Sequence, residues 1–442
     1  AAVFDTAILG SNPSAPANLM KKTFLKNKFL SKIKNFFFPF YRSPELKKLF
    51  KILNKDQTSK KAVAMFVGGC VRNFILNEKI DDIDIATIFT PDEIKEKFKN
   101  TEFQVIETGV EHGSTTLLCN NFKFELTTLR KDIKTDGRHA EVDYIEDWMK
   151  DSERRDFTIN AIYIDNKGKI FDPQMGIKDL RNNVVKFIGD PSKRIEEDFL
   201  RIIRFIRFCL QYNHNTFEPS TIEAIKLNLN GIKNLSKERI LNELFKILKL
   251  DNFKYINEIE DLKNIFLLIF SELKYINRLS KLNFISTDLK LEINSLLAIL
   301  LIDDKENHEY FCHKYKTSNL IKEKLTFFNN QYKNYTENKK YFKNDLKNNI
   351  YLIGKKDIQA LNLITFFINK KKSFKDYSLI SKNIESISIP KFPFDGKYLL
   401  SKGVPEGQKI GIILKNLEEE WIQNNYVLEE SKAKQIINRL NN

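Results

Sequence analysis

The chain has 442 residues, enough for two or more domains, and 42% of them are hydrophobic and 30% charged. A formal net charge of +15 at pH 7 favours polyanionic partners, nucleic acid first and an anionic membrane second. The apolar stretches at 265–270 and 296–302 are too short to span a bilayer, which argues against stable membrane insertion. The cysteines are widely spaced, which argues against a disulfide framework or a zinc finger.

The beginning of the chain differs in composition from the rest. Residues 1–19 contain no lysine and are rich in Ala, Ser, Asn and Pro, so we expect an appended or unstructured segment. Residues 20–43 form a basic, aromatic extension, which fits a transit peptide, an interfacial helix, an RNA-contacting arm or a plain solvated extension. We predict a cytoplasmic, bacterial-like protein, or a mitochondrial one if this extension is a transit peptide.

Apolar periodicity predicts an amphipathic helix near 44–53 and then a mixed domain of strands and helices up to about residue 190. Strands are predicted at 62–67, 80–87, 115–119, 122–129, 161–164 and 184–187. Residues 132–147 have the composition of a polar loop. From residue 191 the periodicity is helical to the end, so the predicted fold class is α+β, a small mixed-sheet head followed by an all-helical region.

A glycine pair, Gly68 and Gly69, separates the first predicted strand from a helix. Glycine lets backbone N–H groups approach an anion at the N-terminus of a helix. Arg72, in the first turn, adds a bidentate donor for phosphate. An ordinary glycine turn has the same sequence, so the interpretation as a triphosphate cradle depends on the carboxylates that follow.

Asp82 and Asp84 alternate with isoleucines, so both carboxylates project from one face of the predicted strand, about 6–7 Å apart at the backbone. Such a pair suits Mg²⁺, which takes oxygen ligands, and two ions about 4 Å apart suit in-line nucleotidyl transfer. The alternative is an edge strand with a solvated acidic face. Glu125, on the strand at 122–129, is a third carboxylate that helps to hold the metals, orients the attacking hydroxyl or forms a cross-strand salt bridge.

Two further sets of polar residues suit nucleotide binding. Arg155 and Asp156 open a predicted helix, and Asn160 lies four residues beyond Asp156 on the same face. Arginine donates to phosphate and aspartate accepts from a sugar hydroxyl, which suits a ribonucleotide, although a charged helix N-terminus is the alternative.

Asp198 and Arg201 are three residues apart in a predicted helix and are expected to share a face. An acceptor beside a donor matches the pairing edges of cytosine and adenine, whereas uracil and guanine place a carbonyl opposite the carboxylate. An intrahelical ion pair is the alternative. Arg204 continues this basic face, toward phosphate or toward solvent.

Taken together, these motifs resemble the class II tRNA nucleotidyltransferases, the CCA-adding enzymes and bacterial poly(A) polymerases of the polymerase β superfamily. The similarity is collinear from residue 66 to about residue 250. Its motifs are Gly68-Gly69-x-Val71-Arg72, Asp82-Ile83-Asp84-Ile85-Ala86-Thr87, Phe124-Glu125-Leu126-Thr127-Thr128-Leu129-Arg130, Asp136-Gly137-Arg138-His139-Ala140, Arg154-Arg155-Asp156-Phe157-Thr158-Ile159-Asn160-Ala161, Asp172-Pro173-x-x-Gly176-x-x-Asp179-Leu180 and Glu197-Asp198-x-x-Arg201.

The resemblance implies a catalytic head at 44–190, a base-recognising neck at 191–250, a helical body at 251–350 and a tRNA-binding helical tail at 351–442. It implies template-independent addition of CCA to tRNA 3′ ends from CTP and ATP, with two Mg²⁺ ions and release of pyrophosphate. Asp156 would recognise the ribose 2′-OH, and Asp198 with Arg201 would act as an amino-acid template.

The resemblance also places Arg138 in the flexible loop that accompanies A addition. One departure is Asn73, where the family usually has aspartate, and this puts a supporting contact at the cradle in doubt. The competing predictions are a poly(A) polymerase or A-adding enzyme and, in another class, a non-catalytic RNA-binding protein. The oligomeric state is not indicated by the sequence.

One metal site outside the head is also conceivable from spacing. His308, Cys312 and His313 would share a helix face and bind zinc, the alternative being a buried cysteine and surface histidines.

Overall fold

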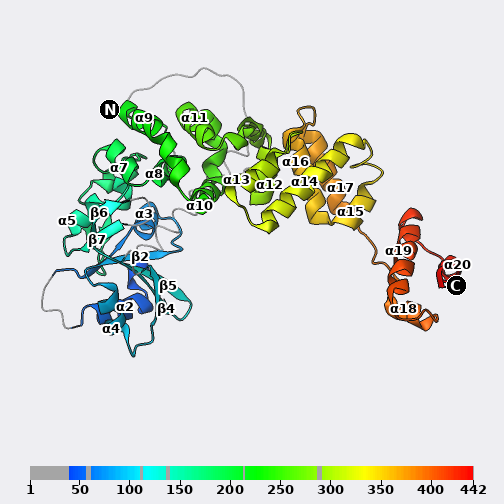
Figure 1. Ribbon diagram of the computed structural model, residues 1–442, viewed down its shortest axis with the longest axis horizontal. Helices are drawn as coiled ribbons and strands as arrows, with labels where there is room; N and C mark the ends of the chain where they lie inside the picture. The colour runs from blue at the N-terminus through cyan, green and yellow to red at the C-terminus, as the bar shows by residue number, and fades with distance from the viewer. Residues whose placement is uncertain are drawn as a thin grey trace, which may run out of the picture. The chain divides into compact units, whose positions relative to one another are not determined.

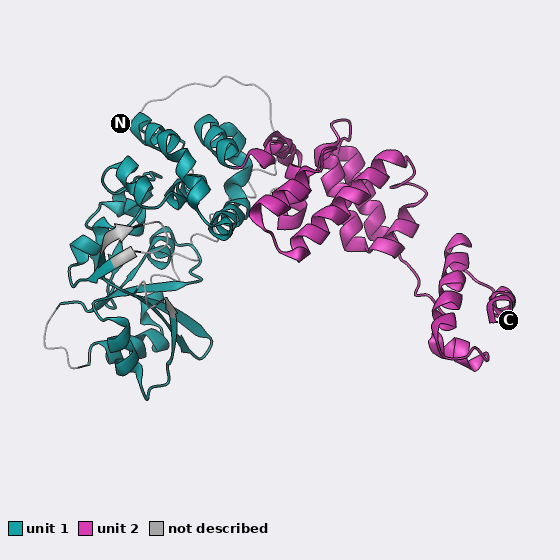
Figure 2. Cartoon of the chain, viewed as in Figure 1, with its two compact units in different colours: residues 1–269 teal, residues 270–442 magenta. Residues whose placement is uncertain are grey.

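The computed structural model describes residues 39–55, 61–109, 113–135, 140–212, 215–285 and 291–441. The chain divides into two compact units, residues 1–269 and 270–442, which Figure 2 draws in separate colours. The first unit holds the strands together with helices, and the described part of the second unit is helical (Figure 1). The predicted α+β class is therefore confirmed, while the finer division into head, neck, body and tail stays a prediction.

The first unit contains, among its described residues, a seven-stranded sheet with the order β3-β4-β5-β2-β1-β8-β9. Neighbouring strands run antiparallel except β2 and β5, which run parallel. A separate hairpin pairs β6 with β7. The strands are β1 (Ala64–Val67), β2 (Ile83–Thr87), β3 (Gln104–Gly109), β4 (Ser114–Cys119), β5 (Phe122–Thr128), β6 (Arg130–Thr135), β7 (Ala140–Tyr144), β8 (Tyr163–Ile164) and β9 (Ile170–Phe171).

The register of the central strands positions the carboxylates. All of β1 is buried, which suits a short apolar strand in the middle of a sheet. In β5 burial alternates, so that Phe124 lies in the core and Glu125 is exposed. Strand β2 pairs with β1 on one side and β5 on the other, and Asp84 thereby lies between Val67 and Glu125.

Helix starts in the head have clear local causes. Ser43 caps α2 (Pro44–Leu53) by accepting from the backbone N–H of Leu46, and Pro44 occupies the first position, where its missing N–H costs nothing. Thr90 and Glu93 form a capping box at α4 (Pro91–Phe98). The other head helices are α3 (Gly69–Leu76), α5 (Trp148–Glu153) and α6 (Gly176–Arg181).

The helical part of the first unit packs around α8 (Leu200–Gln211), which contacts α10 and α7. One face of α8 is apolar and buried, and a row of arginines at positions 201, 204 and 207 lines another face. The remaining helices here are α7 (Pro191–Glu197), α9 (Pro219–Asn228), α10 (Lys237–Leu248) and α11 (Glu260–Ile269).

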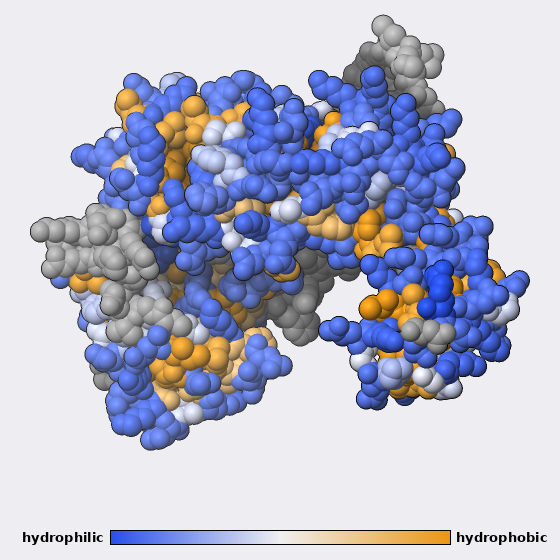
Figure 3. Space-filling model, turned by 45° about the vertical axis from the view of Figure 1, so that its right-hand side comes forward, coloured by the Kyte–Doolittle hydropathy of each residue, from blue (hydrophilic) through white to orange (hydrophobic). Residues whose placement is uncertain are grey.

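The second unit is built from amphipathic helices around local apolar clusters. One cluster includes Ile350, Ile358 and Leu361, and another includes Leu399 and Leu417. Hydrophilic residues cover most of the face seen in Figure 3, with smaller hydrophobic patches between them. The helices are α12 (Ile293–Leu301), α13 (Asn307–Tyr315), α14 (Asn319–Glu337), α15 (Leu346–Ile353), α16 (Lys355–Ile368), α17 (Phe374–Ser386), α18 (Gly396–Ser401), α19 (Gln408–Gln423) and α20 (Glu430–Asn441). In the described part of the chain, no helix combines the length and apolar character that crossing a membrane requires.

Some of the secondary-structure predictions are wrong. Residues 184–187 form no strand, because Phe187 makes only an isolated bridge with Phe157. Most of the region predicted as a polar loop forms the hairpin of β6 and β7. Strand β2 begins at Ile83, so Asp82 lies just before the strand and not within it.

Candidate active site

The glycine pair forms the turn between β1 and α3. Gly68 has a φ of 75°, which favours glycine because a Cβ would be strained there. A Cβ on Gly68 would also lie 3.3 Å from Oδ2 of Asp84, so the side chain of Asp84 lies directly against this turn. The predicted turn between a strand and a helix is confirmed, and it adjoins one of the two predicted metal ligands.

Three carboxylates gather beside this turn. Asp84 and Glu125 are directly opposed in the parallel pair of β2 and β5, which places their side chains on one face, about 4.8 Å apart at the backbone. Burial raises the pKa of Asp84, and the negative charges of Glu125 and Asp82 raise it further, against the opposing effect of Arg155 and Arg72. Asp84 therefore needs a cation close by to remain ionised at low electrostatic cost.

Glu125 has a cationic neighbour on its own strand. Oε1 of Glu125 lies 2.6 Å from Nζ of Lys123, and both side chains are about half exposed, at 51% and 55%. The predicted alternative of a cross-strand salt bridge is replaced by this pair within β5. Because the pair is exposed, it is weak and leaves Glu125 open to another cation.

Arg72 is buried and not free in the cradle. Its Nε donates to the hydroxyl of Tyr212 at 2.9 Å, and its Nη1 donates to Oδ1 of Asn160. Its guanidinium also lies 5.0 Å from the centre of the Phe208 ring. A Cβ built on Gly69 would lie 3.8 Å from Nη2 of Arg72, so this end of the guanidinium lies near the glycine turn.

Asn73, the departure from the family pattern, has a local structural role. Its Nδ2 donates to the carbonyl of Lys79 at 2.6 Å, and its own carbonyl accepts from the backbone N–H of Glu78. An aspartate could not donate to that carbonyl. Asn73 thus ties α3 to the segment that leads to Asp82.

Asp156 is held by a dense set of donors. Its Oδ1 accepts from Nδ2 of Asn160 at 2.6 Å and from the backbone N–H of Phe157 at 2.9 Å. Its Oδ2 accepts from Nε and Nη2 of Arg204 at 2.7 and 2.6 Å. Burial alone would raise the pKa of Asp156, but Arg204, Asn160 and Arg201 together hold it at about 2. Asp156 is therefore ionised throughout the physiological range.

The helix predicted to begin at Arg154 is wrong. Helix α5 ends at Glu153, the next residues form a turn, and a single 3-10 turn follows at Thr158–Asn160. The contact between Asp156 and Asn160 is nevertheless present, because the turn folds back over the same four residues. Gly176 allows this packing, since a Cβ there would lie 2.2 Å from the carbonyl oxygen of Thr158.

Arg155 has a buried structural partner. It donates to Oδ2 of Asp151 from Nε at 3.3 Å and from Nη2 at 3.1 Å, and it donates to the hydroxyl of Tyr163 at 3.0 Å. Arg154 donates to the other oxygen of Asp151 at 2.7 Å. Asp151 is 0% exposed, and despite its burial the two arginines lower its pKa to about 2. Asp151 was not among the predicted site residues, although its spacing of three and four residues from the two arginines is visible in the sequence.

Asp198 and Arg201 do not share a helix, so that prediction is wrong. Asp198 ends α7 in an extended conformation, and its Oδ1 accepts from the backbone N–H of Leu200, the first residue of α8, at 3.1 Å. Its Oδ2 accepts from Nη2 of Arg239 at 2.7 Å. Arg201 pairs with Glu197 at 2.5 Å. The two residues stand at one helix junction, each with a different ionic partner.

Arg239 is a second residue that sequence analysis did not assign to the site. Ser236 caps α10 by accepting from the backbone N–H of Arg239, and the side chain of Arg239 reaches Asp198. Arg207, farther along α8, pairs at 2.7 Å with the buried carboxylate of Glu243.

One aromatic ring joins three of the site arginines. The guanidinium groups of Arg72, Arg204 and Arg207 lie 5.0, 5.6 and 4.1 Å from the centre of the Phe208 ring. Phe208 is itself 1% exposed. The ring is thus a buried contact for the cations and not a surface on which a base could stack. Arg138, assigned to the flexible loop, lies outside the described residues.

A cavity elsewhere in the head does not include these residues. Its volume is about 1330 Å³, and Ala64, Met65 and Ile88 line it, so it lies at the other end of β1 and β2 from Gly68 and Asp84.

The chain is similar in sequence to several known proteins. The family model described as the poly A polymerase head domain matches residues 64–186, and the model described as the probable RNA and SrmB-binding site of polymerase A matches residues 216–274. The human protein CCA tRNA nucleotidyltransferase 1, mitochondrial, is 30% identical over 414 residues, 88% of this chain and 91% of the human one. The chain belongs to the class II CCA tRNA nucleotidyltransferase family.

Bacterial members of the family are also similar to the chain. The CCA-adding enzyme of Lactobacillus helveticus is 40% identical over 186 residues, which are 42% of this chain and 45% of that enzyme. The crystal structure of the Bacillus stearothermophilus CCA-adding enzyme in complex with CTP matches with a TM-score of 0.68 and 20% identity, and the match covers 90% of this chain and 98% of that one. This likeness shows that the chain has the CCA-adding enzyme fold.

Proposed function

We propose that this protein is a template-independent tRNA nucleotidyltransferase that completes tRNA 3′ ends with CCA, using CTP and ATP and releasing pyrophosphate. The observation that carries the proposal is the register of β2 and β5, which sets Asp84 opposite Glu125 and against the Gly68 turn. The names of the human and bacterial relatives support the substrate, and the crystal structure of the Bacillus stearothermophilus enzyme is a complex with CTP.

Nucleotidyltransferases of this family generally use divalent metal ions. The donor set fits such ions, because Asp84 is crowded by Glu125 and Asp82 and its pKa is raised by burial and then by their charges. Asp82 and Asp84 would hold two Mg²⁺ ions, with Glu125 in support. When bound, the ions would activate the 3′-hydroxyl and stabilise the charge of the leaving pyrophosphate.

The nucleotide is held by residues that already surround the carboxylates. Backbone N–H groups at Gly68 and Gly69 face the triphosphate at the start of α3, with Nη2 of Arg72 beside them. Asp156, ionised and fixed by Asn160 and Arg204, accepts from the ribose hydroxyl. Arg155 acts by keeping positive charge near Asp84 and by fixing the 154–156 turn.

The base is read by Asp198 and Arg201 at the junction of α7 and α8. The carboxylate accepts the exocyclic amino group of cytosine or adenine, and the guanidinium donates to the neighbouring ring acceptor. For this to happen, Asp198 exchanges its contact with Arg239, and Arg201 exchanges its contact with Glu197. In each exchange the charged group stays hydrogen-bonded, with the base in place of its ionic partner.

Mutation of a predicted metal ligand tests the proposal. Asp82→Asn removes a charged oxygen ligand from an exposed position, so the fold stays intact while incorporation of CMP and AMP into tRNA lacking CCA falls by about 100-fold or more. Asp81→Asn is the matched control, because Asp81 is also exposed and forms a salt bridge with Lys79. Equal rates for the two variants would contradict the role of Asp82.

The same assay separates the competing functions. With tRNA that ends at the discriminator base, CTP and ATP supplied singly and together should yield sequential addition of C, C and A. Long A tails would indicate a poly(A) polymerase, addition of A alone would indicate an A-adding enzyme, and absence of product would indicate a non-catalytic RNA-binding protein.

The compartment is a separate question. The relatives include mitochondrial and bacterial proteins. We infer a cytoplasmic or a mitochondrial location, and fusion of residues 1–43 to a fluorescent protein distinguishes them, since only a transit peptide would direct the fusion into mitochondria.

A further inference from the structure

The start of α13 in the second unit contains a buried histidine that lacks hydrogen bonds. His308 is 1% exposed, and neither of its ring nitrogens has a hydrogen-bond partner among the described residues. A buried polar group left in this state costs about 1–3 kcal/mol. Buried imidazoles normally find a partner, so the missing partner here points to a ligand.

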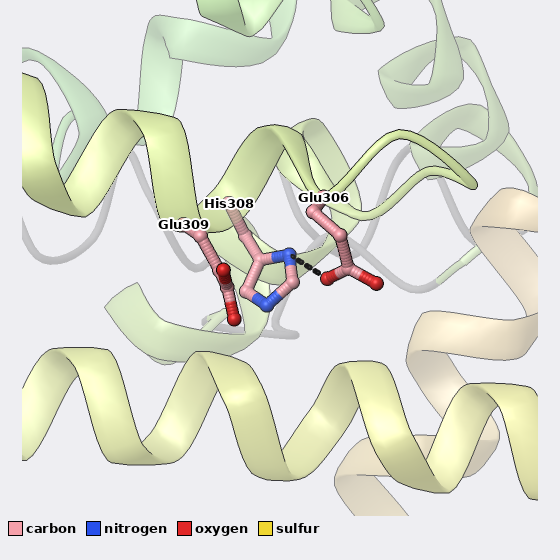
Figure 4. A group of neighbouring side chains, drawn as sticks. All are labelled: Glu306, His308 and Glu309. Atoms are coloured by element: carbon pink, nitrogen blue, oxygen red, sulfur yellow. Dashed lines mark ion pairs between the residues drawn. The ribbon is translucent and has the colours of Figure 1, made fainter.

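Two carboxylates flank this imidazole, as Figure 4 shows. One ligand atom from each of Glu306, His308 and Glu309 lies within 4.8 Å of the others. Oε2 of Glu306 is 3.6 Å from Nδ1 of His308, which is too long for a hydrogen bond. Glu309 is exposed, so its side chain is free to rotate toward the ring.

A fourth polar side chain reaches the group from the neighbouring helix α14. Asn329 is 2% exposed, and its Nδ2 donates to Oε2 of Glu306 at 3.2 Å while its Oδ1 has no partner among the described residues. The oxygen and nitrogen of an amide are exchanged by a simple flip. After that flip, Oδ1 of Asn329 would face the carboxylate of Glu306. Two acceptor oxygens would then oppose each other, and a cation between them would stabilise this arrangement.

We propose that Glu306, His308 and Glu309, with Asn329 as a fourth ligand, bind one divalent transition-metal ion, for which zinc is the probe. An imidazole nitrogen favours zinc and its first-row neighbours over Mg²⁺ and Ca²⁺. Ligand atoms around tetrahedral zinc lie about 3.4 Å apart, so the three residues need only a small inward rotation, chiefly of Glu309.

The surrounding charges suit a dication. The carboxylates of Glu306 and Glu309 balance its charge, and Lys333 of α14 pairs with Oε1 of Glu306, leaving Oε2 for the metal. The ion would join α13 to α14 within the second unit, so its role is structural. The zinc site considered from spacing, formed by His308, Cys312 and His313, is not found among the described residues. Of these three residues only His308 belongs to the group of potential ligands, and His313 is exposed.

Zinc binding by the full chain tests the proposal. Asp82→Asn and Asp84→Asn are included in every protein, so that the head carboxylates do not bind the probe. After removal of metals with a chelator, calorimetric titration with ZnCl₂ should show one ion per chain and a thermal midpoint that rises with zinc. His308→Gln and Glu309→Gln should each weaken the affinity at least tenfold.

His313→Gln is the matched control, because His313 lies on the same helix and is exposed. It should bind zinc like the parent chain. Glu309 is exposed as well, so Glu309→Gln remains informative if the buried His308→Gln fails to fold. Absence of zinc binding by the parent chain, or equal affinity in Glu309→Gln and His313→Gln, would overturn the site.

Discussion

The side chains of the nucleotide site are already paired with one another in the protein. Asp198 contacts Arg239, Arg201 contacts Glu197, and the guanidinium of Arg72 contacts Asn160. A charged group that exchanges one partner for another avoids the cost of standing unpaired in a partly buried site. In the proposed function, the selectivity for a base therefore depends on how well that base replaces the contact that it displaces.

Asp198→Asn should relax the choice between CTP and UTP. The amide can donate to the carbonyl of uracil, where the carboxylate cannot, so the ratio of kcat/KM for CTP over UTP should fall about 10–100-fold. Asparagine also serves as a helix cap, so α8 should be retained. Steady-state kinetics with tRNA ending at the discriminator base provides the measurement.

Asp190→Asn is the control for this variant, because Asp190 also accepts from a backbone N–H at a helix start, that of Lys193 in α7, and contacts no base in the proposal. Its selectivity should match that of the wild type. An unchanged preference for CTP in Asp198→Asn would argue against the amino-acid template.

At the scale of elements, the turn between β1 and α3 links the proposed phosphate cradle to the proposed metal ligands. Gly68→Ala places a Cβ 3.3 Å from Oδ2 of Asp84 and should displace that carboxylate, lowering kcat by about 10–100-fold. Gly189→Ala is a matched control, since both glycines have a φ of 75° but nothing lies within 4 Å of a Cβ at 189.

Both glycine variants should lose about 1 kcal/mol of stability from the left-handed backbone, and only Gly68→Ala should lose activity. The comparison needs a urea unfolding curve and an incorporation assay for each protein. Equal activity losses would mean that general strain, and not the position of Asp84, limits the reaction.

The elements around the site differ in how far sequence could predict them. Strands β1, β2 and β5 follow from apolar runs and alternation. Once the pairing of β2 with β5 is assumed, the sequence also predicts that Asp84 and Glu125 lie on one face of the sheet. The break at Asp198 was not, because polar residues at helical spacing continue from Arg194 to Arg201 without glycine or proline. The contact with Arg239, a residue distant in the sequence, helps to hold Asp198 in its extended conformation.

The turn after α5 could not be predicted from the sequence, for a related reason. Arg154 and Arg155 are good helix formers, and their bonds to Asp151 would be equally possible within a longer helix. The packing of Gly176 against the carbonyl of Thr158 requires the turn, and that contact spans residues that no local pattern connects.

Across the whole molecule, 73 lysine and arginine residues exceed 58 acidic residues, so basic side chains are expected mainly at the surface. Lys372 in the second unit is an exception, with 8% exposure. Its Nζ donates to Oδ1 of Asn362 and to the hydroxyl of Thr365, both at 2.7 Å. Burial lowers the pKa of Lys372 to about 7, with Asp376 opposing and Lys281 adding to the shift.

This burial predicts that stability increases with pH. The unfolded chain has a lysine pKa of about 10.4, so between pH 7 and pH 10 it binds a proton that the folded chain has released. From pH 7 to pH 9 the unfolding free energy of the second unit should rise by roughly 2 kcal/mol, and it should show no such contribution below pH 7.

Urea unfolding of the wild type, Lys372→Met and Lys371→Met at the two pH values checks this effect. Lys371 is exposed, so its variant should keep the pH dependence, whereas Lys372→Met should lose it. The same slope in all three proteins would show that Lys372 remains protonated in the folded state.

In the proposed function, the Phe208 ring supports arginines that take part both in the addition of C and in the addition of A. It contacts Arg72, which the proposal places near the triphosphate, Arg204, which pairs with the proposed ribose ligand Asp156, and Arg207, which pairs with Glu243 of α10. A smaller side chain at this position would loosen all three guanidinium groups at once. Incorporation of C and of A would then decline in parallel, and this shared decline would distinguish a weakened scaffold from an altered preference for one base.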